Sequence, residues 1–258
     1  MATRRSRSTV LRVSPTRLKT YLYCPRQYYY AYVRRLPRRA RGYFSFGTSL
    51  HAALQDFHVQ GGSATQPVDQ LMAQLETSWV SAGYQSPEEQ VAHFDLGQQI
   101  LSEYYRTDEE RRQEVGPPSE TLFLERTLSI PRSGFVLTGR VDRLDRRPDG
   151  VLEVLDYKSG GYMPSPEDLA GDVAIGIYQV LVSGTYHEAP VVGTIYNLRQ
   201  NEAVSITRDQ TALDEVAESV DESVRVLNDD TQYEPAPGPK CRYCDFAGFC
   251  PAAPCADT

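Results

Sequence analysis

The chain has 258 residues, 40% of them hydrophobic, which is enough for one large domain with a real core. No apolar run approaches the roughly 20 residues that span a membrane, and no secretory signal pattern is visible, so we expect a soluble, cytoplasmic protein. The formal net charge of −7 argues against a protein that coats nucleic acid without specificity.

Positive charge is concentrated near the N-terminus. Residues 1–55 hold twelve Arg or Lys and no Asp or Glu, although the chain as a whole is acidic. Such a surface suits a phosphate backbone. We expect residues 1–12 to be a disordered basic arm, and nucleic-acid binding and a merely solvated tail are equally good interpretations of its charge. Between residues 34 and 41 nucleic-acid binding is favoured, with Arg34 and Arg35 as candidate contacts.

Prolines divide the first helical segment. Ser14-Pro15 is typical of a helix start with Ser14 as N-cap, and Cys24-Pro25 interrupts the helix that follows. An aromatic cluster follows, formed by Tyr28, Tyr29, Tyr30 and Tyr32. Packing between helices is favoured over stacking on bases as its role. Further helices are expected around residues 71–79 and over residues 88–112. Residues 13–120 should therefore be mainly helical.

Residues 134–160 predict two β-strands joined by a tight turn. Pro148-Asp149-Gly150 separates two alternating runs, because proline sets the backbone of the first turn residue and glycine supplies the left-handed one. A three-residue loop with this glycine would pair Arg147 with Val151. A two-residue loop would shift the register and turn every side chain of one strand to the other face.

Two acids and a lysine stand out on this hairpin. In the three-residue register Asp142 lies opposite Asp156, and alternation puts Lys158 on the face of Asp156. Facing carboxylates that are partly buried repel each other, so the pair calls for a divalent cation such as Mg²⁺ or Mn²⁺. Lys158 could position or deprotonate an attacking water. The alternative is an ordinary exposed hairpin with surface charges.

The sheet is expected to begin near residues 121–130 and to end near residue 206. A helix is predicted over residues 167–186 and a strand over residues 191–197. Thr207-Arg208-Asp209-Gln210 resembles a capping box, and the apolar stripe after it predicts a helix with an acidic outer face.

The C-terminal tail carries a Cys-x2-Cys-x5-Cys pattern in Cys241, Cys244 and Cys250. A fourth ligand must come from elsewhere, and Cys24 is the candidate, which leaves Cys255 as a free thiol. Four thiolates suit a 4Fe-4S cluster or structural zinc, although zinc more often uses two Cys-x2-Cys pairs. A disulfide framework is not expected in a large intracellular chain.

The hairpin resembles a known nuclease family. Gly139 to Asp145 and Leu155 to Gly160 are similar to the two central motifs of the RecB-like branch of the PD-(D/E)XK nucleases. The resemblance implies that Asp142 and Asp156 bind metal, that the Tyr157 carbonyl contributes, and that Lys158 is catalytic.

Two further segments extend this resemblance toward the N-terminus. Phe46-Gly47-Thr48-Ser49-Leu50-His51 resembles the family segment whose histidine joins the metal site, so the role falls to His51 and not to His58. Glu125 precedes the hairpin, as an acid does in many relatives, and is a candidate to support the metal ligands. The cysteine pattern resembles the iron-sulfur staple of AddB-type helicase-nuclease subunits and of CRISPR-associated RecB-like exonucleases. It implies a 4Fe-4S cluster on Cys24 and the three tail cysteines.

One family motif is incomplete. Relatives carry Gln-x-x-x-Tyr in the helix after the hairpin, but Tyr178 has Ala174 where the glutamine belongs, and Gln179 has Ser183 where the tyrosine belongs. Substrate contact is therefore assigned only to a set of candidates: Arg140, Arg143, Tyr178 and Gln179, besides Arg34 and Arg35.

These observations predict an α/β restriction-endonuclease-like core in a single domain over residues 13–258, with an N-terminal helical segment and a cysteine-ligated C-terminal loop. The expected function is a metal-dependent DNA nuclease, an exonuclease that prefers single strands and acts in repair or recombination, with no small-molecule substrate. The alternatives are a non-catalytic DNA-binding subunit of a helicase-nuclease complex and a CRISPR-adaptation nuclease. Because no Walker A loop is present, a helicase motor would be a separate partner.

Overall fold

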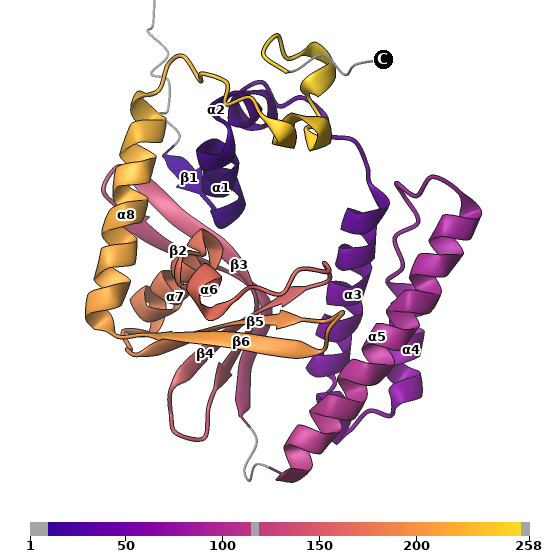
Figure 1. Ribbon diagram of the computed structural model, residues 1–258. Coiled ribbons are helices and arrows are strands. Elements are labelled where there is room, and N and C mark those ends of the chain that lie inside the picture. Colours follow the sequence, from indigo (N-terminus) through magenta and orange to yellow (C-terminus); the bar gives the residue numbers. More distant parts are fainter. Residues whose placement is uncertain (1–9, 115–118, 254–258) are drawn as a thin grey trace, which may run out of the picture.

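A computed structural model describes residues 10–114 and 119–253, so most of the expected basic arm and Cys255 lie outside the described residues. A central sheet stands between two groups of helices, and the N-terminal and C-terminal segments meet at one end of the molecule (Figure 1). This mixed α/β arrangement is the predicted restriction-endonuclease-like fold. No helix in the described ranges is long and apolar enough to cross a membrane.

Six strands form one mixed sheet: β1 (Leu11–Val13), β2 (Glu120–Arg132), β3 (Phe135–Arg146), β4 (Leu152–Lys158), β5 (Val191–Asn197) and β6 (Glu202–Arg208). Their order is β1-β3-β4-β5-β6, and β2 pairs with β3. The β1–β3 and β4–β5 pairs are parallel and the others are antiparallel. The sequence did not predict β1, which takes Leu11 and Arg12 from the expected basic arm into the sheet, whereas β6 lies at the expected end of the sheet near residue 206.

The β3–β4 hairpin has the predicted three-residue loop. The Arg147 amide donates to the Val151 carbonyl at 2.9 Å, and Gly150 has the left-handed φ of 86°. Pairs such as Arg143 with Leu155 continue the same register, which sets Asp142 opposite Asp156 as predicted.

The sheet forks beside β3. Strand β2 pairs with one edge of strand β3 along nearly the whole length of β3. The other edge must hold both β1, at residues 135–137, and β4, at residues 143–146. The stretch of β3 between these pairings has no strand on that side, and it runs up to Asp142.

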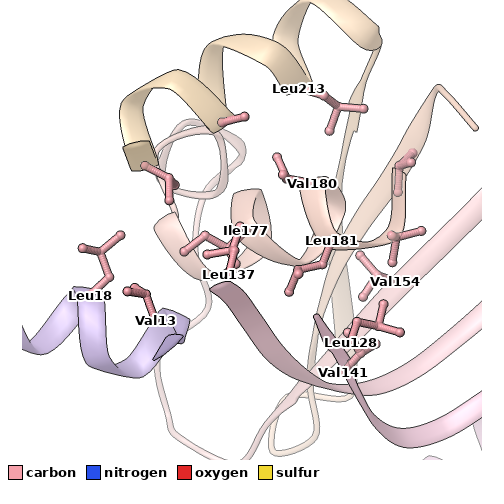
Figure 2. Packing of buried hydrophobic residues seen from close by; sticks show 14 of the residues in the cluster. Val13, Leu18, Leu128, Leu137, Val141, Val154, Ile177, Val180, Leu181 and Leu213 are labelled. Atoms are coloured by element: carbon pink, nitrogen blue, oxygen red, sulfur yellow. The ribbon is translucent and has the colours of Figure 1, made fainter. Parts of the chain in front are cut away.

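Two layers of helices cover the sheet. Helices α7 (Val173–Tyr186) and α8 (Gln210–Asp229) pack on one face, where Ile177 and Leu181 meet the strands and Leu213 packs from α8 (Figure 2). The second core lies under the other helices: α3 (Gly42–Val59), α4 (Val68–Thr77) and α5 (Pro87–Glu114). In Figure 1 α3 stands between the sheet and the α4–α5 pair. Helix α3 is thus held on both sides, so a side chain that it directs toward the sheet has a fixed position.

The N-terminal helices match the sequence prediction. Helix α1 (Pro15–Tyr23) is capped by the Ser14 hydroxyl, and α2 (Pro25–Tyr28) begins after the Cys24-Pro25 break and runs into a π-helical turn (Tyr29–Val33). The tyrosines pack inside the protein as expected, since Tyr28 contacts the Tyr32 and Tyr233 rings. Short 3₁₀ turns complete the chain: Gly62–Ala64, Pro239–Tyr243 and Ala247–Phe249.

Two predicted helix boundaries are wrong. The helix expected over residues 167–186 is two helices, α6 (Pro166–Ala170) and α7, because the Asp172 carboxylate accepts hydrogen bonds from the Ala174 and Ile175 amides and starts a new helix. Helix α8 is capped by Asp209 and not by Thr207, because β6 continues through Arg208 before the helix begins.

Candidate active site

Three acids stand side by side on neighbouring strands. Asp142 lies opposite Asp156 on β4, and the β2–β3 pairs on either side place Glu125 opposite Asp142 on the other edge. Glu125 has a φ of 47°, a left-handed conformation that costs a non-glycine residue about 1–2 kcal/mol. Such strain is found mainly at functional sites, where the surrounding fold maintains it.

Helix α3 brings a histidine to this row. The Nδ1 of His51 lies 3.4 Å from Asp142 Oδ2 and 3.7 Å from Glu125 Oε1. Glu125 also pairs with the Arg140 guanidinium, at 2.6 Å. Gly47, one turn before His51, permits the close approach of the helix, because a Cβ there would lie 2.9 Å from the Ser159 hydroxyl.

The fork in the sheet gives Asp142 a backbone partner. Its Oδ2 accepts the Tyr157 amide at 2.9 Å, in a place where another strand would normally pair. The amide and carbonyl of one strand residue point toward the same neighbour. The Tyr157 carbonyl therefore points toward β3 as well.

Charge repulsion and burial perturb the site strongly. Burial, and then the Asp156 charge, raise the pKa of Asp142 to about 7. Burial alone would lower the pKa of His51, but the neighbouring carboxylates of Glu125, Asp142 and Asp156 raise it. Burial also opposes the charge of Lys158, whose pKa is nevertheless raised because its ammonium pairs with Asp156. Without metal, the acids are thus balanced by protons, by Lys158 beside Asp156 and by Arg140 beside Glu125.

Glu125 and Asp142 line an open cleft of about 810 Å³, while Asp156 is buried beside them. His51, Asp142 and Lys158 line it together with Arg140 and Arg199. A phosphate group entering the cleft would meet cationic side chains beside the acids.

The candidate substrate contacts are divided by the structure. Tyr178 is near the acids, since its pKa is raised by burial and then by the charges of Asp156 and Asp142. Gln179 is buried elsewhere, where its amide donates to the Val191 and Ile206 carbonyls and its oxygen accepts from Arg208.

Three further arginines lie away from the row of acids. Arg143 has its side chain in a second cavity of about 700 Å³, where it pairs with Asp145 at 2.8 Å. His58 lies there as well, and burial, followed by the Arg143 charge, lowers its pKa to about 3. The choice of His51 over His58 is consistent with this placement. Arg34 and Arg35 are exposed on the segment between α2 and α3.

The four cysteines of the predicted cluster come together. Cys24, Cys241, Cys244 and Cys250 line one small cavity beside Tyr30 and Phe246. Burial, with the charges of the other three thiols among the weaker causes, raises the pKa of Cys244. Within the described ranges, however, no three cysteine sulfurs lie within 4.8 Å of one another.

Glu125 is the member of the site that sequence reasoning undervalued. Among the described residues, it forms with His51 and Asp142 the one group whose ligand atoms lie within 4.8 Å of one another. The Ser133-Gly134 turn could have revealed it, because a two-residue loop there pairs Arg132 with Phe135 and, counted back, Glu125 with Asp142.

A mixed sheet whose forked centre carries acids on three strands, an Asp-x-Lys sequence and a helix histidine defines a nuclease with the restriction-endonuclease-like fold. The chain belongs to the PD-(D/E)XK nuclease superfamily, whose family model matches residues 12–251. Nucleases of this superfamily act on DNA and use divalent metals. No curated protein matches the sequence.

One solved structure supports the fold, and a second is similar over most of its length. A crystal structure from Eubacterium rectale named "Putative exonuclease" is 15% identical, covers 96% of this chain and 92% of its own, and has a TM-score of 0.53. The crystal structure of SSO0001 is 14% identical, with 96% and 89% coverage and a TM-score of 0.40.

Proposed function

We propose that this protein is a Mg²⁺- or Mn²⁺-dependent exonuclease that prefers single-stranded DNA and serves DNA repair or recombination. The observation that carries the proposal is the row of Glu125, Asp142 and Asp156, of which Glu125 and Asp142 line an open cleft together with His51 and Lys158. We further propose that residues 13–258 act as one domain, since the cysteine tail contacts the N-terminal helices and α3 packs against the sheet.

The residues fit a small divalent cation. Oxygen ligands at about 2.0–2.1 Å from Mg²⁺ lie roughly 3–4 Å from one another. The separations of 3.4 and 3.7 Å between His51 Nδ1 and the Asp142 and Glu125 oxygens are in this range. His51, Glu125 and Asp142 would hold the ion, with the Tyr157 carbonyl and Asp156 completing the set. When bound, the ion would supply charge that polarises the scissile phosphate.

The remaining polar groups then have distinct roles. Lys158, held by Asp156, lines the cleft and orients the attacking water. Arg140, which is 64% exposed, and Arg199 can each reach a phosphate of the strand. The Tyr157 amide keeps the Asp142 carboxylate in place at 2.9 Å.

A 4Fe-4S cluster on the four cysteines is also proposed. Tetrahedral zinc, with Zn–S bonds of about 2.3 Å, draws its thiolates to within ~4 Å of one another. The cysteines share one cavity, yet among the described residues no three sulfurs are as close as 4.8 Å. Zinc more often uses two Cys-x2-Cys pairs, and this sequence has one such pair, which favours an iron-sulfur cluster over a single zinc ion.

The test is digestion of end-labelled single- and double-stranded DNA by anaerobically purified protein, with Mg²⁺, Mn²⁺ or chelator. We expect metal-dependent release of short products from single strands, and little cleavage of circular single-stranded DNA, which has no end. Asp156→Ala should abolish cleavage while DNA binding persists. A wild-type protein that binds DNA but never cleaves it would make the chain a non-catalytic DNA-binding subunit.

A further inference from the structure

An exposed pair of aromatic rings stands in the active-site cleft. Tyr43 and Phe44, in the first turn of α3, are 57% and 58% exposed, and their ring centroids are 4.3 Å apart. Both residues line the cleft that also contains His51, Asp142 and Lys158. Large aromatic side chains with this exposure usually have a binding role when they lie together at a functional site.

Helix geometry places Phe44, one of the two rings, on the same side of α3 as His51. Phe44 precedes His51 by seven residues, so two helical turns put both side chains on the same face of α3. The separation along the helix axis is about 10 Å, which is the length of about three stacked nucleotides at ~3.4 Å each. Thr48 and Ala52 continue this face of the helix along the cleft.

The surrounding charges favour a nucleic acid as the occupant. The segment that leads into Tyr43 contains Arg34, Arg35, Arg38 and Arg39, all exposed. Arg140 and Arg199 line the cleft itself. Cationic groups for phosphates next to exposed rings for bases are the combination that binds single-stranded nucleic acid.

We propose that Tyr43 and Phe44 form a base-stacking platform that selects single-stranded DNA for the metal centre, an inference that rests on the proposed nuclease function. The rings offer flat apolar faces to unpaired bases of the strand whose phosphate lies near Asp142. In a duplex the base faces are already covered by their neighbours, so the platform gains nothing from paired DNA. The preference for single strands thus resides in the start of α3.

Binding measured by fluorescence anisotropy in chelator, where no cleavage occurs, tests the platform with the full-length protein. We expect the double variant Tyr43→Ala/Phe44→Ala to bind a labelled oligothymidylate at least about tenfold more weakly, since stacking contributes about 1–3 kcal/mol per base. Affinity for duplex DNA should change less than about twofold. Phe44→Trp should retain binding, whereas Phe44→Leu, which is apolar but has no ring, should not.

Two controls separate stacking from general damage. Val59→Ala, at the far end of α3 and 67% exposed in wild type, should leave both affinities unchanged. Wild type should bind an oligonucleotide with abasic sites as weakly as the double variant binds oligothymidylate. The double variant should bind the abasic oligonucleotide no more weakly than it binds oligothymidylate. The platform is refuted by a double variant that binds single strands as tightly as wild type does. It is also refuted if the double substitution weakens binding to abasic DNA as much as it weakens binding to oligothymidylate.

The outcomes also distinguish this inference from the proposed function. A wild-type protein that cleaves single strands, with a double variant that binds and cleaves them equally well, refutes the platform alone. A wild-type protein that shows the stacking-dependent affinity but cleaves no DNA under any metal refutes the nuclease function alone.

Discussion

Replacing Asp142 by asparagine should stabilise the metal-free protein. The Asp142 side chain is only 11% exposed, and its pKa of about 7 means that the folded state holds the proton far more tightly than the unfolded chain does. Stability from this group is therefore greatest at low pH, and it falls as the pH rises from about 4, the unfolded pKa, toward 7. Well above pH 7 the stability contributed by protonated Asp142 is fully lost.

The magnitude follows from the shift. A rise from 3.8 to about 7 corresponds to roughly 4 kcal/mol at about 1.4 kcal/mol per pKa unit. Asparagine keeps the shape, and its oxygen can still accept the Tyr157 amide, but it carries no charge. We expect Asp142→Asn to raise the free energy of unfolding by about 4 kcal/mol at pH 8 and by about 2 kcal/mol at pH 5.

Urea unfolding in chelator at the two pH values measures this difference. Saturating Mg²⁺ or Mn²⁺ should reverse the order at pH 8, because wild type gains stability from binding the ion and the variant loses an essential ligand. Asp149→Asn, at the exposed hairpin turn, is the matched control and should change little at either pH. A destabilised Asp142→Asn protein in chelator at pH 8 would refute the account of repelling, buried carboxylates.

Three other substitutions test separate parts of the structure. Lys158→Arg should reduce cleavage strongly while DNA binding remains, because a guanidinium cannot lose a proton or replace a compact amine; normal rates would leave the lysine only an electrostatic role. Cys24→Ala should bleach the broad visible absorption expected of an iron-sulfur protein and lower the free energy of unfolding by about 3–5 kcal/mol, as the loss of a long-range link does. A colourless wild type with stoichiometric zinc would contradict the cluster. Gly139→Ala should destabilise by about 1–3 kcal/mol, because the new Cβ would lie 2.8–2.9 Å from the Leu181 and Tyr178 side chains, whereas Gly171→Ala, with its nearest neighbour at 3.8 Å, should not.

The hairpin could be predicted from sequence because local turn chemistry determines its register. Pro148-Asp149-Gly150 allows one loop geometry that agrees with the alternation on both sides, and the position of Asp142 opposite Asp156 follows. The grouping of the four cysteines that line one cavity could also be predicted, since the spacing of the tail left one distant candidate. Both inferences depend on short segments, in which the turn residues or the cysteine spacing limit the possible geometry without reference to the rest of the fold.

The parts that could not be predicted depend on distant contacts. Strand β1 has three residues, and only its pairing with β3 makes it a strand. Nothing local indicates that Glu125 adopts a left-handed conformation, because the neighbouring strand and His51 maintain it. The position of Gln179 also depends on distant contacts. Its place in a motif did not reveal that its amide donates hydrogen bonds to backbone carbonyls of β5 and β6.

The wide separation of the cysteines along the chain affects biosynthesis. Every residue of the row of acids, together with His51 and Lys158, leaves the ribosome before Cys241 is made. At about 5–20 residues per second the tail follows Lys158 by roughly 4–16 seconds. During that interval Cys24 has no partner thiols, and a truncated chain would retain the nuclease residues but could never assemble the four-thiol site. Completion of that site therefore marks a chain that has been translated at least through Cys250.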